Sequence, residues 1–506
     1  MTDNANLYAH FRKHFPADLD TQLLLDADGR RVSYAAAEEV SARIANSLLQ
    51  LGAEPGDRIT VQVEKSIENL LLYLACLRAG LVYHPLNPAY KAAELTYFLG
   101  NAEPTIVICS RASLALMKNL LPANGVKAVL TLDADGSGTL MERAAGANTQ
   151  VDVAQSDGKD MAALLYSSGT TGQPKGIVLS HDNLRKNAET LVNAWGFSAS
   201  DRLLHMLPIY HAHGLFVGIG CVLMSGASLV WHSSFNDKAA IAALPYCTTM
   251  MGVPTFYTRL LANPDFGPEC CANIRLFVSG SAPLLAETFV EFKTRTGHTI
   301  LERYGMTETG MNTSNPLHGE RRAGTVGPAL PGVTARVVDA AGEPVADGET
   351  GDLQLKGPNV FAGYWRLPEK TAEDFTADGF FNTGDKATID ADGYVSIVGR
   401  AKDMVITGGL NVYPKEIELV IDDMTGVKES AVIGVPDGDF GEAVVAVIVP
   451  DDQSSAEKAP TAAEIIAYCK ERLANFKVPK RVEIIDALPR NAMGKVQKNL
   501  LREEYS

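Results

Sequence analysis

The sequence predicts an α/β protein with a large N-terminal domain of α/β sheets, which includes a β-rich subdomain, and a small α+β C-terminal domain. The chain has 506 residues, more than the ~250 to 300 at which a single hydrophobic core usually stops growing. Residues 1–330 alternate short apolar runs with amphipathic stretches, a pattern typical of parallel sheets covered by helices. After Arg400 a second series of strand and helix patterns begins, long enough for a separate domain.

The elements of the first part follow from apolar spacing. Apolar residues recur at helical spacing through 37–51, which predicts a helix. Residues 59–63 are predicted to form a strand, and residues 67–79 a helix that ends at Gly80, because glycine favours the backbone conformation that closes a helix. Further strands are predicted at 105–109, 128–132, 162–166 and 275–279.

The pattern changes over residues 331–400. Short strand-like runs are separated there by the turn-like stretches DAAGEP, DGETGD, TADGF and DADGY, which predict a β-rich subdomain. Beyond it, SAVIGV (430–435) and AVVAVIV (443–449) are predicted strands, and a helix is predicted near 461–474. These elements form the predicted α+β C-terminal unit.

Composition limits the partners of the protein. With 46% apolar and 21% charged residues the chain fits a globular protein, and its formal net charge of −15 argues against nucleic acid or an anionic membrane as a general partner. The start MTDNANLYAHFRKHFP lacks an apolar signal-peptide core, and no run of ~18 apolar residues is present. We therefore expect a cytoplasmic protein.

Cysteine and histidine patterns do not predict a metal site. The seven cysteines form no CxxC pair and lack the spacing of zinc ligands, so we expect buried free thiols. His211 and His213 have no zinc-ligand partner at useful spacing either.

The strongest local motif is YSSGTTGQPKG, residues 166–176, which follows a predicted strand. Its glycines let backbone N–H groups approach phosphate oxygens, its hydroxyls donate hydrogen bonds, and Lys175 supplies a positive charge. The motif is not a Walker A loop, because Gly169 and Gly172 are separated by two residues and Pro174 precedes the lysine. It predicts a phosphate-binding loop of another kind, with a polar surface loop as the alternative.

This loop and four later motifs resemble the adenylate-forming superfamily of acyl-CoA synthetases, luciferases and peptide-synthetase adenylation domains. The later motifs are RYGMTET (303–309), NTGD (382–385), GRAKDMVITGGLNVYPKEIE (399–418) and PRNAMGK (489–495), in the order and approximate spacing of that superfamily. The resemblance covers nearly the whole chain. It implies an acid-CoA ligase that uses ATP with Mg²⁺ to form an acyl-adenylate and then transfers the acyl group to CoA, releasing AMP and pyrophosphate.

Each residue of the nucleotide motifs has a physical role to offer. Tyr304 presents a ring on which adenine can stack, Thr307 a hydroxyl for phosphate, and Glu308 an oxygen ligand for Mg²⁺. The resemblance implies that Asp385 accepts hydrogen bonds from the ribose and that Arg400 assists it. The implied nucleotide-binding set is Ser167, Ser168, Gly169, Thr170, Thr171, Gly172, Lys175, Gly280, Ser281, Ala282, Glu302, Arg303, Tyr304, Gly305, Met306, Asp385 and Arg400.

Lys495 is similar to the catalytic lysine of the superfamily, which bridges the carboxylate and the α-phosphate. A cation there would stabilise the charge that develops in the transition state. The implied catalytic set is Lys495, Thr307, Glu308 and His211.

The resemblance also implies a mobile C-terminal domain. Lys402 matches the hinge position, so the implied units are an N-terminal domain over 1–399, a hinge over 400–402 and a C-terminal lid domain over 403–506. Gly408, Gly409 and Leu410 are expected to line the CoA pantetheine tunnel after rotation. A basic run is a further candidate for the CoA phosphates, with solvated surface lysines as the alternative: Lys470, Arg472, Lys477, Lys480 and Arg481.

The acid must be identified from other segments, namely HMLPIYHAHG (205–214), GVPTFYTRL (252–260) and SGSAPL (279–284). A buried arginine would be costly beside a long apolar tunnel but would find a partner in a short dicarboxylate. Arg259, assisted by His211 and the hydroxyl of Ser279 or Ser281, is the leading candidate for the distal carboxylate, and Arg303 is the second. The alternatives are that Arg259 faces solvent and that Arg303 serves ATP or an internal salt bridge.

Together with LERYGMTETGMNTSNP (301–316), these segments resemble the malonyl-CoA synthetases, including members that accept methylmalonate. Malonate is therefore the favoured substrate. Many such enzymes have a larger hydroxyl-bearing residue where this chain has Ala212, so the tolerance for 2-substituted malonates stays open. Met306 and Met311 either flank the C2 substituent or fill the core.

Three alternatives remain open: a ligase for another short acid, a stand-alone enzyme that loads a carrier protein, and an inactive binder of ATP or acyl-adenylate. Lys175, Glu308, Asp385 and Lys495 are all present, which disfavours the inactive binder. The expected partners are a small carboxylic acid, ATP and CoA, with no nucleic acid and no membrane, in a monomer or homodimer.

Overall fold

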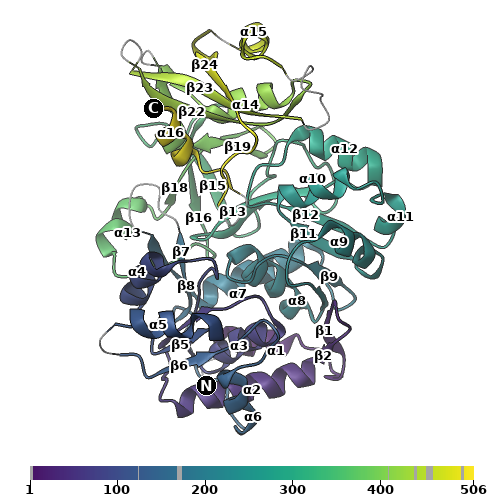
Figure 1. The fold of residues 1–506 in the computed structure, drawn as a ribbon, viewed down its shortest axis with the longest axis vertical. Coiled ribbons are helices and arrows are strands. Elements are labelled where there is room, and N and C mark those ends of the chain that lie inside the picture. Colours follow the sequence, from purple (N-terminus) through teal and green to yellow (C-terminus); the bar gives the residue numbers. More distant parts are fainter. Residues whose placement is uncertain are drawn as a thin grey trace.

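The computed structural model describes residues 4–122, 125–167, 174–407, 410–437, 441–451, 460–473, 475–491 and 495–506. Figure 1 shows two helix-covered sheets in the lower part of the molecule, a small antiparallel sheet above them, and the C-terminal unit at the top. The α/β class with a β-rich subdomain and a smaller C-terminal α+β unit is confirmed. The domain boundaries at 399 and 402 stay predictions.

The first large sheet carries the predicted phosphate loop between two of its strands. Its central strands are parallel and almost wholly buried, because helices cover both faces. In spatial order its strands are β17 (Gly363–Tyr364), β8 (Lys175–Ser180), β7 (Met161–Ser167), β4 (Val82–Pro85), β3 (Arg58–Gln62), β5 (Ile106–Cys109) and β6 (Ala128–Thr131).

The second large sheet is parallel through its middle and antiparallel at both edges. It ends in the strand that bears the RYGM motif and the strand that follows it. In spatial order its strands are β14 (Gly310–Ser314), β13 (Leu301–Met306), β12 (Leu276–Ser279), β11 (Thr249–Gly252), β9 (Arg202–His205), β10 (Ser228–Trp231), β1 (Gln22–Asp26) and β2 (Arg31–Ser33).

Helices fill the space around the two sheets and join them through one main core. Polar caps set their starts: the hydroxyls of Ser33, Ser66 and Ser180 accept from backbone N–H groups of the first turns. The helices are α1 (Leu7–Lys13), α2 (Tyr34–Gln50), α3 (Ile67–Arg78), α4 (Ala92–Ala102), α5 (Leu114–Leu120), α6 (Thr139–Ala145), α7 (His181–Trp195), α8 (Ile219–Ser225), α9 (Asp237–Ala243), α10 (Pro254–Ala262), α11 (Pro268–Cys271), α12 (Ala286–Thr296) and α13 (Pro368–Asp374).

The remaining sheets lie beyond this core (Figure 1). The β-rich subdomain contains β15 (Thr334–Val338), β16 (Gly351–Lys356), β18 (Phe381–Ile389) and β19 (Val395–Arg400). The C-terminal unit has apolar clusters of its own and contains β20 (Val405–Thr407), α14 (Pro414–Asp422), β22 (Val427–Asp437), α15 (Ala462–Arg472), α16 (Lys498–Tyr505) and the strands β21 (Leu410–Val412), β23 (Gly441–Pro450) and β24 (Arg481–Ile484).

The helices and strands predicted from apolar spacing are confirmed within a few residues at each end. Of the helices that the structure describes, none combines the length and the apolar character needed to cross a membrane.

Candidate active site

The candidate site lies where the carboxyl ends of several strands meet, the usual ligand position in parallel α/β sheets. β12 leads into Gly280 and Ser281, and β13 carries Arg303 and Tyr304. The turn after β13 carries Thr307, which is half-buried, and Glu308, which is buried. The structure thus brings together motifs that lie far apart in the sequence.

Arg303 is buried at the end of the site nearest the predicted acid segments. The residue is only 3% exposed, and among the described residues its Nε and Nη2 atoms have no hydrogen-bond partner. A Cβ atom at Gly280 would lie 2.5 Å from the guanidinium carbon, so the guanidinium packs directly against bare backbone. Burial lowers the pKa of Arg303 to about 10, which leaves it charged at neutral pH. A buried, charged donor with unused N–H groups is suited to bind an anion.

Two histidines lie within electrostatic reach of Arg303. His213 begins a π-helix, His213–Gly218, and its Nδ1 is 3.2 Å from the hydroxyl of Ser281. Burial, followed by the charge of Arg303, lowers the pKa of His211 to about 4 and that of His213 well below its ordinary value. Both imidazoles are therefore neutral at pH 7 and leave the positive charge to Arg303.

Ser281 has a left-handed backbone conformation, with φ at 73°. Such a conformation in a residue other than glycine costs of order 1–3 kcal/mol and is concentrated at functional sites. The strained turn directs the Ser281 hydroxyl to His213, which supports its predicted place beside the acid.

Two predicted acid-binding residues lie elsewhere. Arg259 is exposed on α10, whose Tyr257 and Leu260 face the core, so the structure supports the alternative that Arg259 faces solvent. Ser279 lies in register with Glu302, and strand alternation places both on the face opposite Arg303. Of the two arginine candidates, Arg303 is buried and Arg259 is exposed, and which of them contacts the acid stays a prediction.

Glu302 points to the side of β13 opposite Arg303, where Leu284 lies, and it supports the turn that contains Ser281. Its Oε1 accepts a hydrogen bond of 3.1 Å from the backbone N–H of Leu284. Burial raises the pKa of Glu302 to about 7. Its predicted neighbours in the nucleotide set are placed together: Gly305 and Met306 end β13, and Ala282 follows Ser281.

The nucleotide end of the site contains a connected polar network. Tyr304 donates its hydroxyl to Asp385 at 2.5 Å, and Arg400 forms an ion pair of 2.8 Å with the other carboxylate oxygen. Arg400 also donates to the carbonyl of Thr383 at 3.2 Å. Asp385 and Arg400 thus lie together, as the resemblance implied, and the hydroxyl of Tyr304 has a partner that sequence reasoning did not foresee.

Glu308 lies close to two cations. It is 7% exposed, and burial raises the pKa of its carboxyl group while the charges of Arg400 and Lys175 lower it. A single carboxylate beside a threonine hydroxyl fits Mg²⁺, which commonly uses one or two protein oxygens together with substrate phosphates. Glu308 and Thr307 therefore fit the metal that the superfamily implies.

Lys175 is held by two residues that the sequence analysis missed. Its ammonium is 3.7 Å from a carboxylate oxygen of Asp374 and 4.4 Å above the ring of Tyr364. Tyr364 donates its hydroxyl to the same oxygen at 3.0 Å. The pairing of β17 with β8 brings Tyr364 beside Lys175, and no local sequence pattern predicts that long-range contact. The only sequence signal is the aromatic pair in GYW.

Several predicted residues lie outside the described part of the chain. These are Ser168, Gly169, Thr170, Thr171 and Gly172 of the phosphate loop, Gly408 and Gly409 of the expected CoA tunnel, and the side chain of Leu410. Ser167 and Lys175, at the two ends of the phosphate loop, are described and pair across β7 and β8.

Lys495 lies between the acid and nucleotide ends of the site. Its charge acts on His211, and the charges of Arg400, Asp385 and Glu308 act on it. The side chain keeps access to solvent, yet the surrounding protein excludes enough water to lower its pKa, and Arg400 lowers it further. Its role in bridging the carboxylate and the α-phosphate stays a prediction.

The C-terminal unit contains many ion pairs. Lys402 is exposed at the predicted hinge, and the next residue, Asp403, pairs with Arg502 at 2.8 Å. In the basic run, Lys477 pairs with Glu416 and Arg481 with Glu483. These carboxylates reduce the positive potential of the run, which favours the solvated-surface alternative over a CoA phosphate site.

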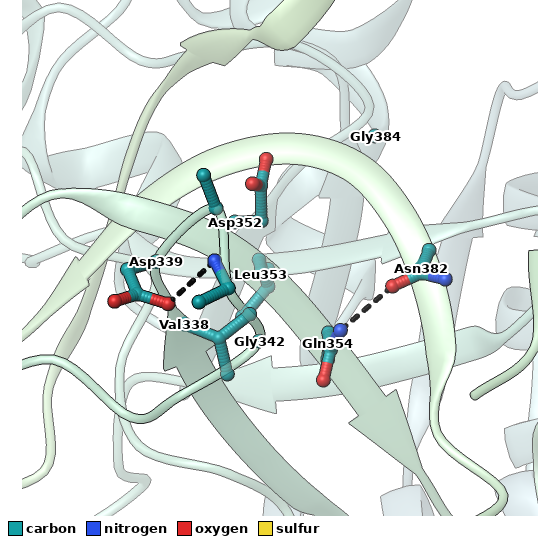
Figure 2. Close-up of a pocket in the computed structure, with 10 residues that line it drawn as sticks. Val338, Asp339, Gly342, Asp352, Leu353, Gln354, Asn382 and Gly384 are labelled. Atoms are coloured by element: carbon teal, nitrogen blue, oxygen red, sulfur yellow. Dashed lines mark hydrogen bonds between the residues drawn. The ribbon is translucent and has the colours of Figure 1, made fainter. Parts of the chain in front are cut away.

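A groove of about 410 Å³ lies on the β-rich subdomain and is separate from the candidate site (Figure 2). Asn382 and Gly384 line it, while Thr383 and Asp385 alternate with them along β18 and face the other way. Asp339 and Asp352 line the groove, and Asp352 forms an ion pair of 2.9 Å with Lys386.

Two solved structures and two characterised relatives resemble the chain. Crystal structures of MatB from Rhodopseudomonas palustris are 50% identical, and each aligns over 99% of both chains. The TM-score is 0.95 for the ATP-bound form and 0.85 for the apo form, so the chain is arranged more like the ATP-bound form. Malonate–CoA ligase of Arabidopsis thaliana is 33% identical over 95% of this chain and 86% of its own, and sulfoacetate–CoA ligase of Cupriavidus necator is 34% identical over 95% and 94%.

Two family models match the chain. The AMP-binding enzyme model covers residues 11–365, and the model of the AMP-binding enzyme C-terminal domain covers residues 416–495. The order of the two matches agrees with the order of the two structural units. This protein therefore belongs to the AMP-binding enzyme family.

Proposed function

We propose that the protein is an ATP-dependent malonate–CoA ligase. The observation that carries the proposal is the buried guanidinium of Arg303, whose Nε and Nη2 atoms have no partner among the described residues. A substrate with a second anionic group would supply that partner. Two similar proteins are named for the substrates malonate and sulfoacetate, and each of these acids has a second anionic group.

The charge of Arg303 is large enough to select a diacid. Two opposite unit charges at ~4 Å are worth roughly 4 kcal/mol at an effective dielectric of about 20. That energy corresponds to about a thousandfold in affinity. The Ser281 hydroxyl, already hydrogen-bonded to His213, lies beside the same anion position. Malonate is short enough to reach Arg303 with one carboxylate while the other faces the nucleotide.

The proposed first step is attack of the acid's free carboxylate on the α-phosphate of ATP, with loss of pyrophosphate. Lys495 stabilises the charge on the reacting oxygens, because it lies between His211 at the acid end and Asp385 at the nucleotide end. Asp385 and Arg400 bind the ribose, and Lys175 binds the phosphates. Glu308 and Thr307 would hold Mg²⁺, which neutralises phosphate charge.

The proposed second step is attack of the CoA thiol on the malonyl-adenylate, giving malonyl-CoA and AMP. It follows rotation of the C-terminal domain about Lys402, which removes Lys495 and brings the segment around Gly408 to the adenylate. A carrier-protein thiol is the alternative acceptor, and assays with free CoA and with a phosphopantetheinyl carrier separate the two.

The test is AMP release with ATP, CoA and a panel of malonate, methylmalonate, succinate, sulfoacetate, acetate, butyrate and octanoate. Wild type, Arg303→Ala and Arg259→Ala are compared, the exposed Arg259 serving as the matched control. Malonate preference that collapses in Arg303→Ala and persists in Arg259→Ala supports the proposal. A larger loss in Arg259→Ala would restore the ranking predicted from the sequence, and preference for a monoacid would overturn the diacid assignment.

A further inference from the structure

Lys65 is buried in the described structure without an acidic partner. The residue is 8% exposed and follows β3 of the first large sheet, just before the cap of α3. Among the described residues no carboxylate lies within ion-pair distance of it. Burial alone lowers its pKa well below the ordinary value. A lysine in such a place is unusual, because an apolar side chain of similar volume would avoid the cost of desolvation.

The ammonium of Lys65 is held by His205 and Trp231 instead of by a carboxylate. It donates to His205 Nδ1 at 2.9 Å and to the His205 carbonyl at 3.0 Å. It also lies 4.2 Å from the centre of the Trp231 ring, on which the His205 ring stacks at 5.1 Å. The π face, the imidazole nitrogen and the carbonyl together stabilise the cation.

These contacts join the two large sheets near the carboxyl ends of their strands. Lys65 lies in the segment that joins β3 of the first sheet to α3, whereas His205 and Trp231 are the last residues of β9 and β10 in the second. His205 and Trp231 are in register as neighbours. Lys65 therefore links the first large sheet to the second, which carries Arg303.

His205 also contacts the π-helix that begins at His213. Because its Nδ1 accepts from Lys65, its Nε2 carries the proton and donates to the carbonyl of Gly214 at 3.0 Å. Gly214 is the second residue of the π-helix that begins at His213, and a Cβ at Gly218 would lie 3.2 Å from the His205 ring. The imidazole is thus enclosed by the helix that presents His213 to Ser281 and Arg303.

We propose that Lys65 is a positioning residue for acid binding that acts through His205. It fixes the proton of His205 on Nε2, and His205 fixes the start of the π-helix. That start carries His213, and its Leu215 N–H holds the carbonyl of His211, so both histidines are placed near Arg303. The nature of the acid in this inference rests on the proposed function. The described network of Tyr304, Asp385 and Arg400 has no part in this chain of contacts, so the effect should be larger for the acid than for the nucleotide.

The test compares Lys65→Met, His205→Gln and the double variant with wild type in steady-state AMP formation. Lys386→Met is the matched control, since it removes a half-buried lysine that pairs with Asp352 in the β-rich subdomain. We expect the malonate KM to rise about tenfold or more in Lys65→Met, since small displacements in a site cost that much or more. The ATP KM should change less than about twofold. The double variant should be no worse than the worse single variant, because the two residues act in series.

Three results would overturn the inference: an unchanged malonate KM, equal rises in malonate and ATP KM with a lower Tm, and additive losses in the double variant. If Lys65→Met does not fold, Lys65→Gln keeps an amide donor toward His205, and the same split between malonate and ATP is expected of it at smaller size. A wild type that does not activate malonate would overturn the proposed function instead, and the KM split would then be measured with the acid that it prefers.

Discussion

The acid end and the nucleotide end of the site differ in how far the protein satisfies its own polar groups. At the nucleotide end, both carboxylate oxygens of Asp385 have protein partners, Tyr304 and Arg400. At the acid end, two nitrogens of Arg303 and Nε2 of His213 have none within the described residues. The first region is held by its own hydrogen bonds, whereas the second has donors left over for a ligand.

Because of this difference, we expect the two ends to contribute differently to ATP affinity and to the selection of the acid. A hydrogen bond from a ribose hydroxyl to the charged Asp385 is worth about 1.5–3 kcal/mol net. An anion that binds Arg303 gives a partner to an unpaired buried charge, where the penalty is larger, about 3–5 kcal/mol. We therefore expect the identity of the acid to depend mainly on Arg303 and the nucleotide to depend on many smaller contacts.

The largest effect is expected from Arg303→Met, which fills a similar volume without the charge. The kcat/KM for malonate should fall about a thousandfold, because the distal carboxylate loses its ion pair. The ATP KM should stay within about threefold of wild type. Steady-state AMP formation at varied malonate and ATP measures both. Parallel losses for malonate and acetate would contradict a role in diacid selection.

A smaller loss, confined to one half-reaction, is expected from Lys495→Ala. Adenylation should slow about a hundredfold or more, as for removal of one donor that stabilises transition-state charge. Thioester formation from supplied malonyl-adenylate should be unchanged. Pyrophosphate exchange and single-turnover CoA transfer separate the two steps, and equal loss in both would refute the assignment.

Asp385→Asn tests the nucleotide end of the site. It removes the charged acceptor shared by Tyr304 and Arg400, so the ATP KM should rise about tenfold, the value of one charge-assisted hydrogen bond. The malonate KM should not change. If malonate affinity fell as much as ATP affinity, the two regions would not be separable in the way proposed.

Of these variants, Glu302→Gln should have the smallest effect on catalysis. It should instead change how the stability of the protein depends on pH. Since burial raises the pKa of Glu302 from 4.5 to about 7, the stability that its proton contributes is fully present below pH 4.5 and lost as the pH rises through 7. Above pH 7 the cost is at most roughly 3 kcal/mol. Glutamine can still accept from Leu284 and carries no charge. The Tm of the variant relative to wild type should therefore rise between pH 5 and pH 8, and a constant difference would contradict the buried charge.

Most of the fold could be predicted because the signals are local. Apolar spacing located α2 and α3, and turn residues marked the β-rich subdomain. The order of motifs placed Asp385, Arg400 and Lys495 in one site, and the structure brings these residues together.

The parts that could not be predicted depend on side-chain direction or on long-range contacts. β13 is buried on both faces, so its sequence does not tell which side Arg303 takes and which side Glu302 takes. Lys65 is a polar residue in the stretch VEKS and reads as a surface position, although a distant histidine covers it. Asp374 reaches Lys175 only through the pairing of β17 with β8.

That pairing also has a consequence for the order of events during synthesis. β8 leaves the ribosome early, but its outer neighbour, β17, ends at Tyr364, so one edge of the first sheet stays uncovered while the intervening residues are made. At ~5–20 residues per second this interval lasts roughly ten seconds or longer. An exposed strand edge is prone to pairing with other chains. The nascent enzyme is therefore most vulnerable to aggregation before residue 364 emerges, and protection by chaperones should matter most in that interval.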